Sequence, residues 1–290
     1  MSTQTRDRVV EGPLSVVVRP GSDAAAVYRS AVLAPGFGAE PSLDLRYFGG
    51  RTLPDLRYML VYLDGWPTHG RTDLDHALAA AMRDPDLNNV LAQYFPSAQV
   101  TATFAGSLVH DGAVPDRVDR TWVETLAGRL GDDSSLMCIL LPPGAVLADG
   151  DVDSQHGLGG YHGSVHTGSS DRYYSVAVYS DGDNGIVAFD EPWKNVCATL
   201  YHEQETRTDP DVEDAIRQGS APGADKLLGW YSPRGGEIGD IPMSEANGDI
   251  GLVMKEVPLA DGSGTVPIQL MWSNAVGGPE GPIPQPHQPK

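Results

Sequence analysis

The chain has 290 residues, of which 40% are hydrophobic and 7% aromatic, a composition typical of a globular protein with a sizeable core. Its 20 Lys and Arg stand against 39 Asp and Glu, and the formal net charge of −19 argues against nucleic acid and anionic membranes as partners, because both require clustered basic side chains. Solubility is the simpler explanation of this charge, and cation binding by Asp-rich loops is the more specific one.

The sequence also allows predictions about the compartment of the protein and the state of its two cysteines. The first residues contain no apolar segment of the kind found in signal peptides, and no run reaches the roughly 18 apolar residues of a membrane-spanning helix. We therefore expect a cytoplasmic protein, with a secreted mature form as the alternative. Cys138 and Cys197 lie in apolar surroundings and are expected to be buried thiols rather than a disulfide.

The two ends of the chain differ in composition from the middle. Residues 1–12 are polar and are expected to be disordered, and residues 277–290 are rich in Pro and Gly and are expected to form an extended tail. Residues 13–276 show no internal repeat and no clear linker, which predicts one domain.

Strands and helices alternate along this central part. Segments rich in β-branched or aromatic residues predict strands at 14–18, 58–63, 100–108, 136–141, 173–179 and 267–273. Helices are predicted at 73–83, 86–94, 118–130 and 192–207, the last with Pro192 in its first turn. The alternation predicts an α/β layer architecture. The strand that immediately precedes the helix at 192–207 also fits a zincin, in which an edge strand lies over the cleft and the next helix carries the metal motif.

The end of that helix begins like a zincin motif and then departs from it. In the HExxH motif two histidines bind zinc and the intervening Glu serves as general base. His202 and Glu203 occupy the first two of these positions, but Thr206 stands where the second histidine would be. Glu205 and Asp209 lie on the same helix face if the helix continues that far. The motif predicts a metal site in which carboxylates replace a histidine, or the remains of one; a core histidine beside solvated acids is the other interpretation.

Two further segments carry candidate site residues. Glu237 and Asp240 belong to a Gly-Gly-Glu-Ile-Gly-Asp motif, whose glycines allow close backbone approach, although a surface turn has the same composition. Residues 154–166 interleave three histidines, including His162, with glycines, which predicts a flexible loop able to bring imidazoles to a metal or substrate. There is no GxSxG motif, dinucleotide fingerprint or P-loop.

Taken in order, several motifs resemble the phosphate-induced protein 1, or EXORDIUM-like, family. They are GYHGSV at 160–165, the HE segment with its TDP at 202–210, EIGD at 237–240, GDIGLVMKE at 248–256 and IQLMWSNAVGGPEGP at 268–282. The resemblance covers about residues 55–282 and is strongest from residue 161. It implies a zincin-like fold with His202, Glu203, Glu237, Asp240 and His162 in the site. The family has Glu at the fifth position of the HE helix, whereas this chain has Thr206 there and Glu205 one position earlier.

The sequence thus predicts a single-domain α/β, zincin-like mixed sheet with an active-site helix at about 192–207. The predicted function is a metal-dependent, peptidase-like hydrolase with zinc as the first choice of metal and Glu203 as general base. The predicted metal ligands are His202, Glu205, Asp209, Glu237, Asp240 and His162. The alternative is a non-catalytic binding or structural protein in which carboxylates hold calcium, or no metal. The substrate, whether peptide or small molecule, and the oligomeric state stay open.

Overall fold

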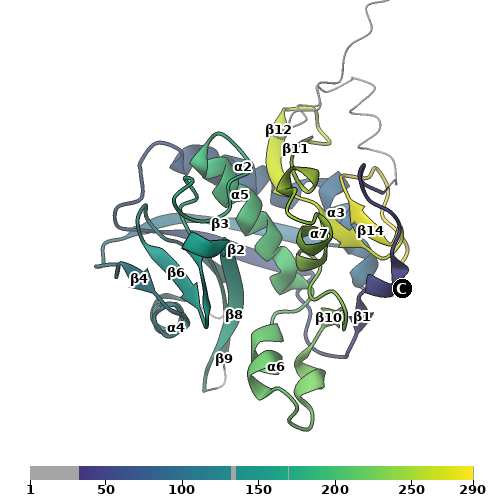
Figure 1. Ribbon diagram of the computed structural model, residues 1–290, viewed down its shortest axis with the longest axis horizontal. Helices are drawn as coiled ribbons and strands as arrows, with labels where there is room; N and C mark the ends of the chain where they lie inside the picture. The colour runs from purple at the N-terminus through teal and green to yellow at the C-terminus, as the bar shows by residue number, and fades with distance from the viewer. Residues whose placement is uncertain (1–32, 132–134, 169, 290) are drawn as a thin grey trace, which may run out of the picture.

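A computed structural model describes residues 33–131, 135–168 and 170–289. The expected disordered segment 1–12 and the predicted strand 14–18 lie outside these ranges. The largest sheet among the described residues has five strands, in the order β3-β2-β5-β9-β8 (Figure 1). Its strands are β2 (Asp55–Leu63), β3 (Thr101–His110), β5 (Leu136–Leu140), β8 (Gly160–Thr167) and β9 (Ser170–Ala177). The first four strands in the spatial order run parallel, and β8 pairs antiparallel with β9 at the edge.

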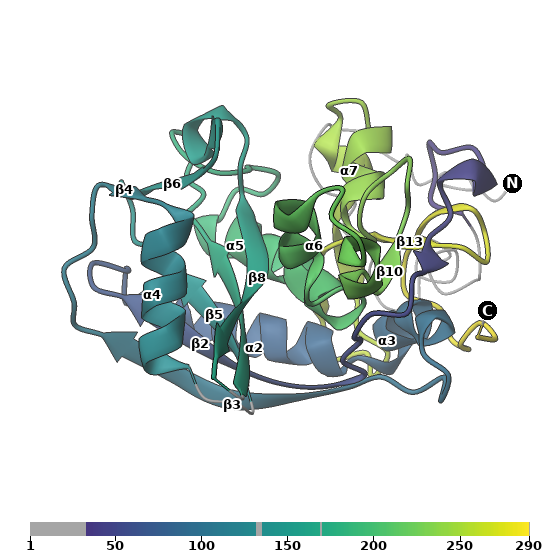
Figure 2. The ribbon, with the colours of Figure 1, turned by 90° about the horizontal axis from the view of Figure 1, so that it is seen from below.

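Helices cover both faces of this sheet. The helices α2 (Arg71–Arg83) and α5 (Pro192–His202) pack on one face, where Leu60 and Cys138 belong to the same apolar cluster. The helix α4 (Arg120–Leu130) packs on the other face, against the cluster that contains Val61 and Ile139 (Figure 2). Because β5 is covered on both faces, its sequence LMCIL is apolar throughout and fully buried. The predicted α/β fold with a mixed sheet is therefore confirmed.

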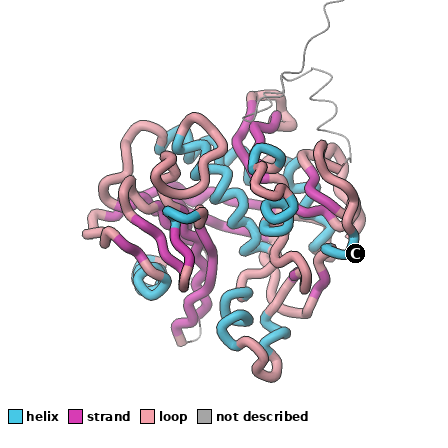
Figure 3. Tube along the Cα trace, viewed as in Figure 1, coloured by secondary structure: helices cyan, strands magenta, loops and turns pink. Residues whose placement is uncertain are grey.

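Smaller elements surround this core. The remaining α-helices of the described residues are α3 (Pro85–Leu91), α6 (Val212–Gln218) and α7 (Asp240–Glu245). The remaining strands are β1 (Arg46–Tyr47), β4 (Arg117–Val118), β6 (Val146–Asp149), β7 (Val152–Asp153), β10 (Trp230–Tyr231), β11 (Met254–Pro258), β12 (Thr265–Gln269), β13 (Met271–Ser273) and β14 (Gly278–Glu280). They form the small sheets β1-β10, β4-β6-β7, β11-β12 and β13-β14. The helix α5 lies between the main sheet and the C-terminal strands, so strands gather on both sides of it (Figure 3).

The prediction of a flexible loop at 154–166 is wrong from residue 160 onward. These residues form β8, which pairs with β9 in an unbroken register that includes His162 opposite Ser175. Its glycines and histidines carry little strand propensity. The ladder with β9 supplies the hydrogen bonds that stabilise the strand instead, and this partner is not visible in a local sequence pattern.

The predicted helix at 192–207 ends earlier than expected. The α-helix stops at His202, and Glu203–Arg207 form a 3-10 helix, η4. The Thr206 hydroxyl donates to the Glu203 carbonyl oxygen at 2.8 Å, and the carbonyl oxygen of Arg207 accepts from the amide of Leu53 at 2.7 Å. These bonds hold the chain in a tighter turn. Consequently, the prediction that helical spacing places Asp209 on the same helix face as His202 is wrong.

The prediction of an extended tail is wrong for residues 278–283. The strand β14 pairs with β13, and the side chain of Ile283 is 0% exposed. The amide of Ile283 donates to the Asp86 carbonyl oxygen at 2.9 Å, and Asn89 donates to the Ile283 carbonyl oxygen at the same distance. The Pro- and Gly-rich composition did not indicate that this segment packs against α3.

Two further expectations concern the cysteines and membrane-spanning helices. Cys138 and Cys197 are buried free thiols, as expected. Among the described residues, none of the helices combines the length and the apolar character needed to cross a membrane.

Candidate functional site

The HE motif opens into a pocket of about 220 Å³. The pocket lies where the end of α5 meets the residues that lead into β8, and residues of α7, β11 and β12 also line it. Its polar lining is Thr199, His202, Glu203, Asp240 and Gln269, and its apolar lining includes Leu158, Ile186, Met243 and Met254. Residues from six separate stretches of the chain therefore place carboxylates, an imidazole and apolar side chains around one cavity.

His202 is held in one orientation by Gln269. The side-chain amide nitrogen of Gln269 donates to the Gly239 carbonyl oxygen at 2.7 Å, so its oxygen is directed to the other side. That oxygen lies 3.0 Å from His202 Nδ1, which must be the donor of this hydrogen bond. His202 Nε2 then faces Asp240, whose Oδ1 lies 3.8 Å away. An imidazole whose Nδ1–H is fixed by a protein acceptor is the usual arrangement of a metal-ligating histidine.

Glu203 is almost completely buried between the pocket and His162. Its side chain is 2% exposed, and its Oε2 lies 3.4 Å from His162 Nδ1. The neighbouring Gly160 leaves space for the Glu203 carboxylate. A Cβ on residue 160 would lie 3.0 Å from Glu203 Oε1 and 2.4 Å from the Val176 carbonyl oxygen. The glycine at the start of β8 therefore permits a buried carboxylate beside the edge strand.

His162 connects Glu203 with a second buried acidic region. Its Nε2 lies 3.2 Å from the Asp209 carbonyl oxygen and 3.4 Å from Glu237 Oε1. Both neighbours are acceptors, which places a proton on Nε2. Asp209 thus meets His162 through its backbone, while its carboxylate accepts from the Gly229 amide at 2.9 Å. Burial raises the pKa of the Asp209 carboxyl to about 7.

The predicted ligands fall into two neighbouring groups. His202 and Asp240 face each other at the pocket, whereas His162, Glu237 and the Asp209 carbonyl form the buried group. Glu205 lies in η4, and its side chain is outside the described part of the structure. Within the described residues, one set of three ligand atoms lies close enough to share a metal ion, and it is a different set: His166, Asp211 and Asp214.

Sequence reasoning missed two of the polar pocket residues. Gln269 orients His202, yet it lies in a strand and belongs to no metal motif. Its location in the IQLMWS segment, which is part of the family resemblance, was the available signal. Thr199 lies one helical turn before Glu203 and lines the same pocket, which the spacing within α5 could have indicated.

Comparison of the chain with protein-family models, with curated proteins and with solved structures finds no match.

Proposed function

We propose that this protein is a metal-dependent hydrolase whose reaction takes place in the pocket at the end of α5. The observation that carries the proposal is the convergence of His202, Glu203 and Asp240 on one cavity, with His202 oriented by Gln269. The resemblance of the motif order to a zincin-like family points to the same residues.

The donor atoms at the pocket are compatible with zinc. Zinc binds imidazole nitrogen and carboxylate oxygen at about 2.0–2.2 Å, so His202 Nε2 and Asp240 Oδ1, 3.8 Å apart, can contact one ion. A catalytic zinc commonly has three protein ligands, and His202 and Asp240 would be two of them. Such an ion lowers the pKa of a bound water and polarises a carbonyl group.

Glu203 is the group that takes the proton from the attacking water. It lines the pocket, so its carboxylate can accept a proton there, and His162 Nδ1 lies behind it at 3.4 Å. His162 in turn is positioned by the Asp209 carbonyl oxygen and by Glu237. A proton on Glu203 is therefore held near a second titratable group, away from bulk water, until it is passed to the leaving group.

The size of the pocket limits the substrate. About 220 Å³ is below the range of roughly 300–1,000 Å³ that is typical for complete small-molecule ligands. The wall of Leu158, Ile186 and the two methionines suits an apolar group. We therefore propose a peptide-like substrate that inserts a single apolar side chain and presents its carbonyl group to His202 and Asp240.

Replacement of Glu203 by Gln tests this function. The variant keeps the shape of the side chain but removes the proton acceptor, so turnover of a mixed peptide library should fall by a factor on the order of 10² or more. The melting temperature should stay near that of the wild type. The matched control is Glu245→Gln, an exposed change on α7 that should leave activity unchanged.

Three results would contradict the proposal. They are equal activity of wild type and Glu203→Gln, activity that resists both chelation and His202→Ala, and a zinc-loaded wild type that cleaves nothing in the library. The last result would favour the non-catalytic alternative, a binding protein.

A further inference from the structure

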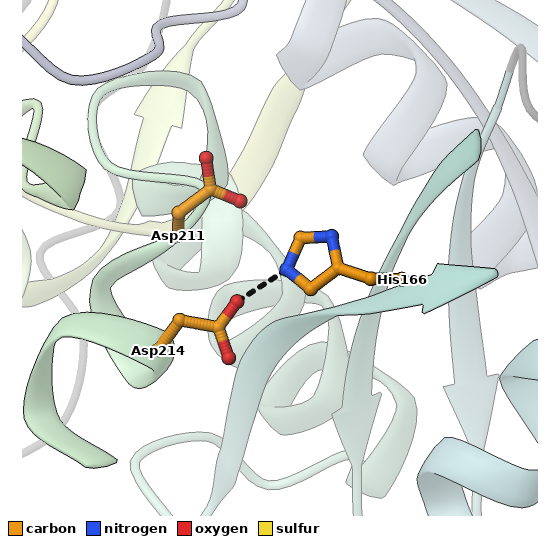
Figure 4. Close-up of side chains that lie close together, drawn as sticks. All are labelled: His166, Asp211 and Asp214. Atoms are coloured by element: carbon orange, nitrogen blue, oxygen red, sulfur yellow. Dashed lines mark hydrogen bonds and ion pairs between the residues drawn. The ribbon is translucent and has the colours of Figure 1, made fainter. Parts of the chain in front are cut away.

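We propose that His166, Asp211 and Asp214 form a second divalent-cation site, separate from the pocket and selective for zinc-like ions. The three residues come from the edge strand β8 and from the start of α6, and their side chains point toward one another (Figure 4). One ligand atom from each lies within 4.8 Å of the others. An ion bound at about 2.0–2.2 Å requires only small adjustments of these side chains.

Asp171 prepares His166 for this role. Its Oδ1 accepts from His166 Nδ1 at 2.6 Å, and Arg51 binds the other carboxylate oxygen at 2.5 Å. With Nδ1 protonated and fixed, Nε2 is the atom directed at Asp211 and Asp214. This carboxylate–histidine arrangement is the outer shell commonly found behind a metal-bound imidazole.

The environment of Asp211 independently supports a bound cation at this site. The residue is 5% exposed, and its Oδ1 has no hydrogen-bond partner. Arg51 Nε lies 3.9 Å from its other oxygen, Oδ2, and Ser164 also interacts with this carboxylate. A buried carboxylate oxygen without a donor is unfavourable in free energy, and a cation would satisfy it.

The ligand types select the kind of ion. A histidine nitrogen with two carboxylates suits zinc and similar transition metals, whereas calcium prefers six to eight oxygens. The side chain of His166 is 52% exposed, so an ion can reach the site and water can complete its coordination. Arg217 binds Asp214 Oδ1 at 2.8 Å and leaves Oδ2, the atom nearest His166, on the cation side.

The position of the site indicates what an ion would do. Asp211 and Asp214 follow Asp209 closely, and the Asp209 carbonyl positions His162. An ion shared with His166 would join this segment to β8, the strand that carries His162. The cation would thus act as a structural clamp that maintains the buried group behind Glu203.

Zinc titration of the metal-stripped, full-length protein tests the site. Calorimetry with ZnCl₂ should give a binding event that His166→Ala and Asp214→Asn each abolish, while Asp171→Asn weakens it by about 10- to 100-fold. The control is His156→Ala. His156 also pairs with an aspartate, Asp153 at 2.6 Å, but belongs to no three-ligand set in the described residues.

The pocket site must be separated from this one. His202→Ala should leave the binding event at His166 intact, so failure of the proposed function and failure of the clamp give different results. Unchanged zinc stoichiometry and affinity in both His166→Ala and Asp214→Asn would overturn the proposal. The proposal would also be overturned if none of the zinc binding of the wild type depended on His166. His166 would then only bridge Asp171 and Asp214 as an imidazolium.

Discussion

Arg207 shows how one buried residue holds the turn after the HE motif. Its guanidinium donates to the carbonyl oxygens of Pro54 at 3.1 Å and Thr101 at 2.9 Å. Pro54 directly precedes β2, and Thr101 is the first residue of β3. The Nε of Arg207 donates to the side chain of Gln204 at 3.1 Å. The residue is fully buried, and burial lowers the pKa of the guanidinium to about 10. Arg207 therefore connects η4 to the start of the sheet.

We expect Arg207→Ala to lower the free energy of unfolding by about 3 kcal/mol, because the carbonyl groups of Pro54 and Thr101 lose a charged donor and the fully buried side chain leaves a void. Urea denaturation followed by circular dichroism measures this change. Arg234→Ala removes an exposed arginine instead and should change stability by less than about 0.5 kcal/mol. If the two variants were equally stable, Arg207 would have no structural role of this kind.

At the residue scale, the HE motif indicated residues that line one pocket, but it did not predict the backbone conformation around them. The sequence predicted that His202, Glu203 and Asp240 belong to one site, and all three line the same pocket. It could not predict that the helix ends at His202, since the turn that follows is held by a hydrogen bond between Arg207 and Leu53, far away in the sequence. Nothing in the sequence distinguished His166 from the other two histidines of residues 154–166.

At the level of elements, the C-terminal segment behaves as part of the core. Ile283 is completely buried beside α3, and its backbone amide and carbonyl group are both hydrogen-bonded to residues of that helix. The segment from β14 to Ile283 therefore covers the N-terminal part of α3 instead of leaving the domain.

Ile283→Ala should therefore lower the free energy of unfolding by about 2–4 kcal/mol, the usual range for deleting a buried aliphatic side chain. Chemical denaturation of full-length variants measures the effect. Ile216→Ala on α6 is the matched control, because Ile216 is 58% exposed and its truncation should be almost neutral. Similar small effects for both isoleucines would mean that residues 278–283 do not stabilise the fold.

Prediction of elements succeeded where a local pattern was strong. The strands at 58–63 and 136–141 are apolar segments that lie at or near the centre of the sheet, and they were placed within a few residues. The edge strand β8 was missed because its stability depends on pairing with β9. The same limit applies to β14, whose partner β13 supplies the hydrogen bonds that its Gly-Pro-Glu sequence does not indicate.

At the scale of the whole molecule, the site depends on contacts between distant parts of the chain. His162 in β8, His202 in α5, Asp240 in α7 and Gln269 in β12 are brought together by the packing of α5 between the sheet and the C-terminal strands. Sequence order can indicate which motifs belong together. It cannot indicate that the predicted ligands separate into a pocket pair and a buried group, because that division follows from side-chain directions in the assembled fold.

The excess of negative charge leads to a last prediction about the whole molecule. With 39 acidic and 20 basic residues, repulsion among carboxylates outweighs the attraction in the surface ion pairs. Screening should therefore stabilise the protein, and the melting temperature in EDTA should rise between about 10 mM and 500 mM NaCl, as the Debye length falls from about 30 Å to less than 10 Å.

Scanning calorimetry at pH 7.5 and again near the sequence pI of about 4.6 checks the cause of this effect. Near the pI the net charge is small, so the dependence of the melting temperature on salt should largely disappear. Micromolar ZnCl₂ barely changes ionic strength, and any stabilisation it adds at pH 7.5 must come from specific binding. A melting temperature that falls with NaCl at pH 7.5 would instead mean that attractive ion pairs dominate the electrostatics of the fold.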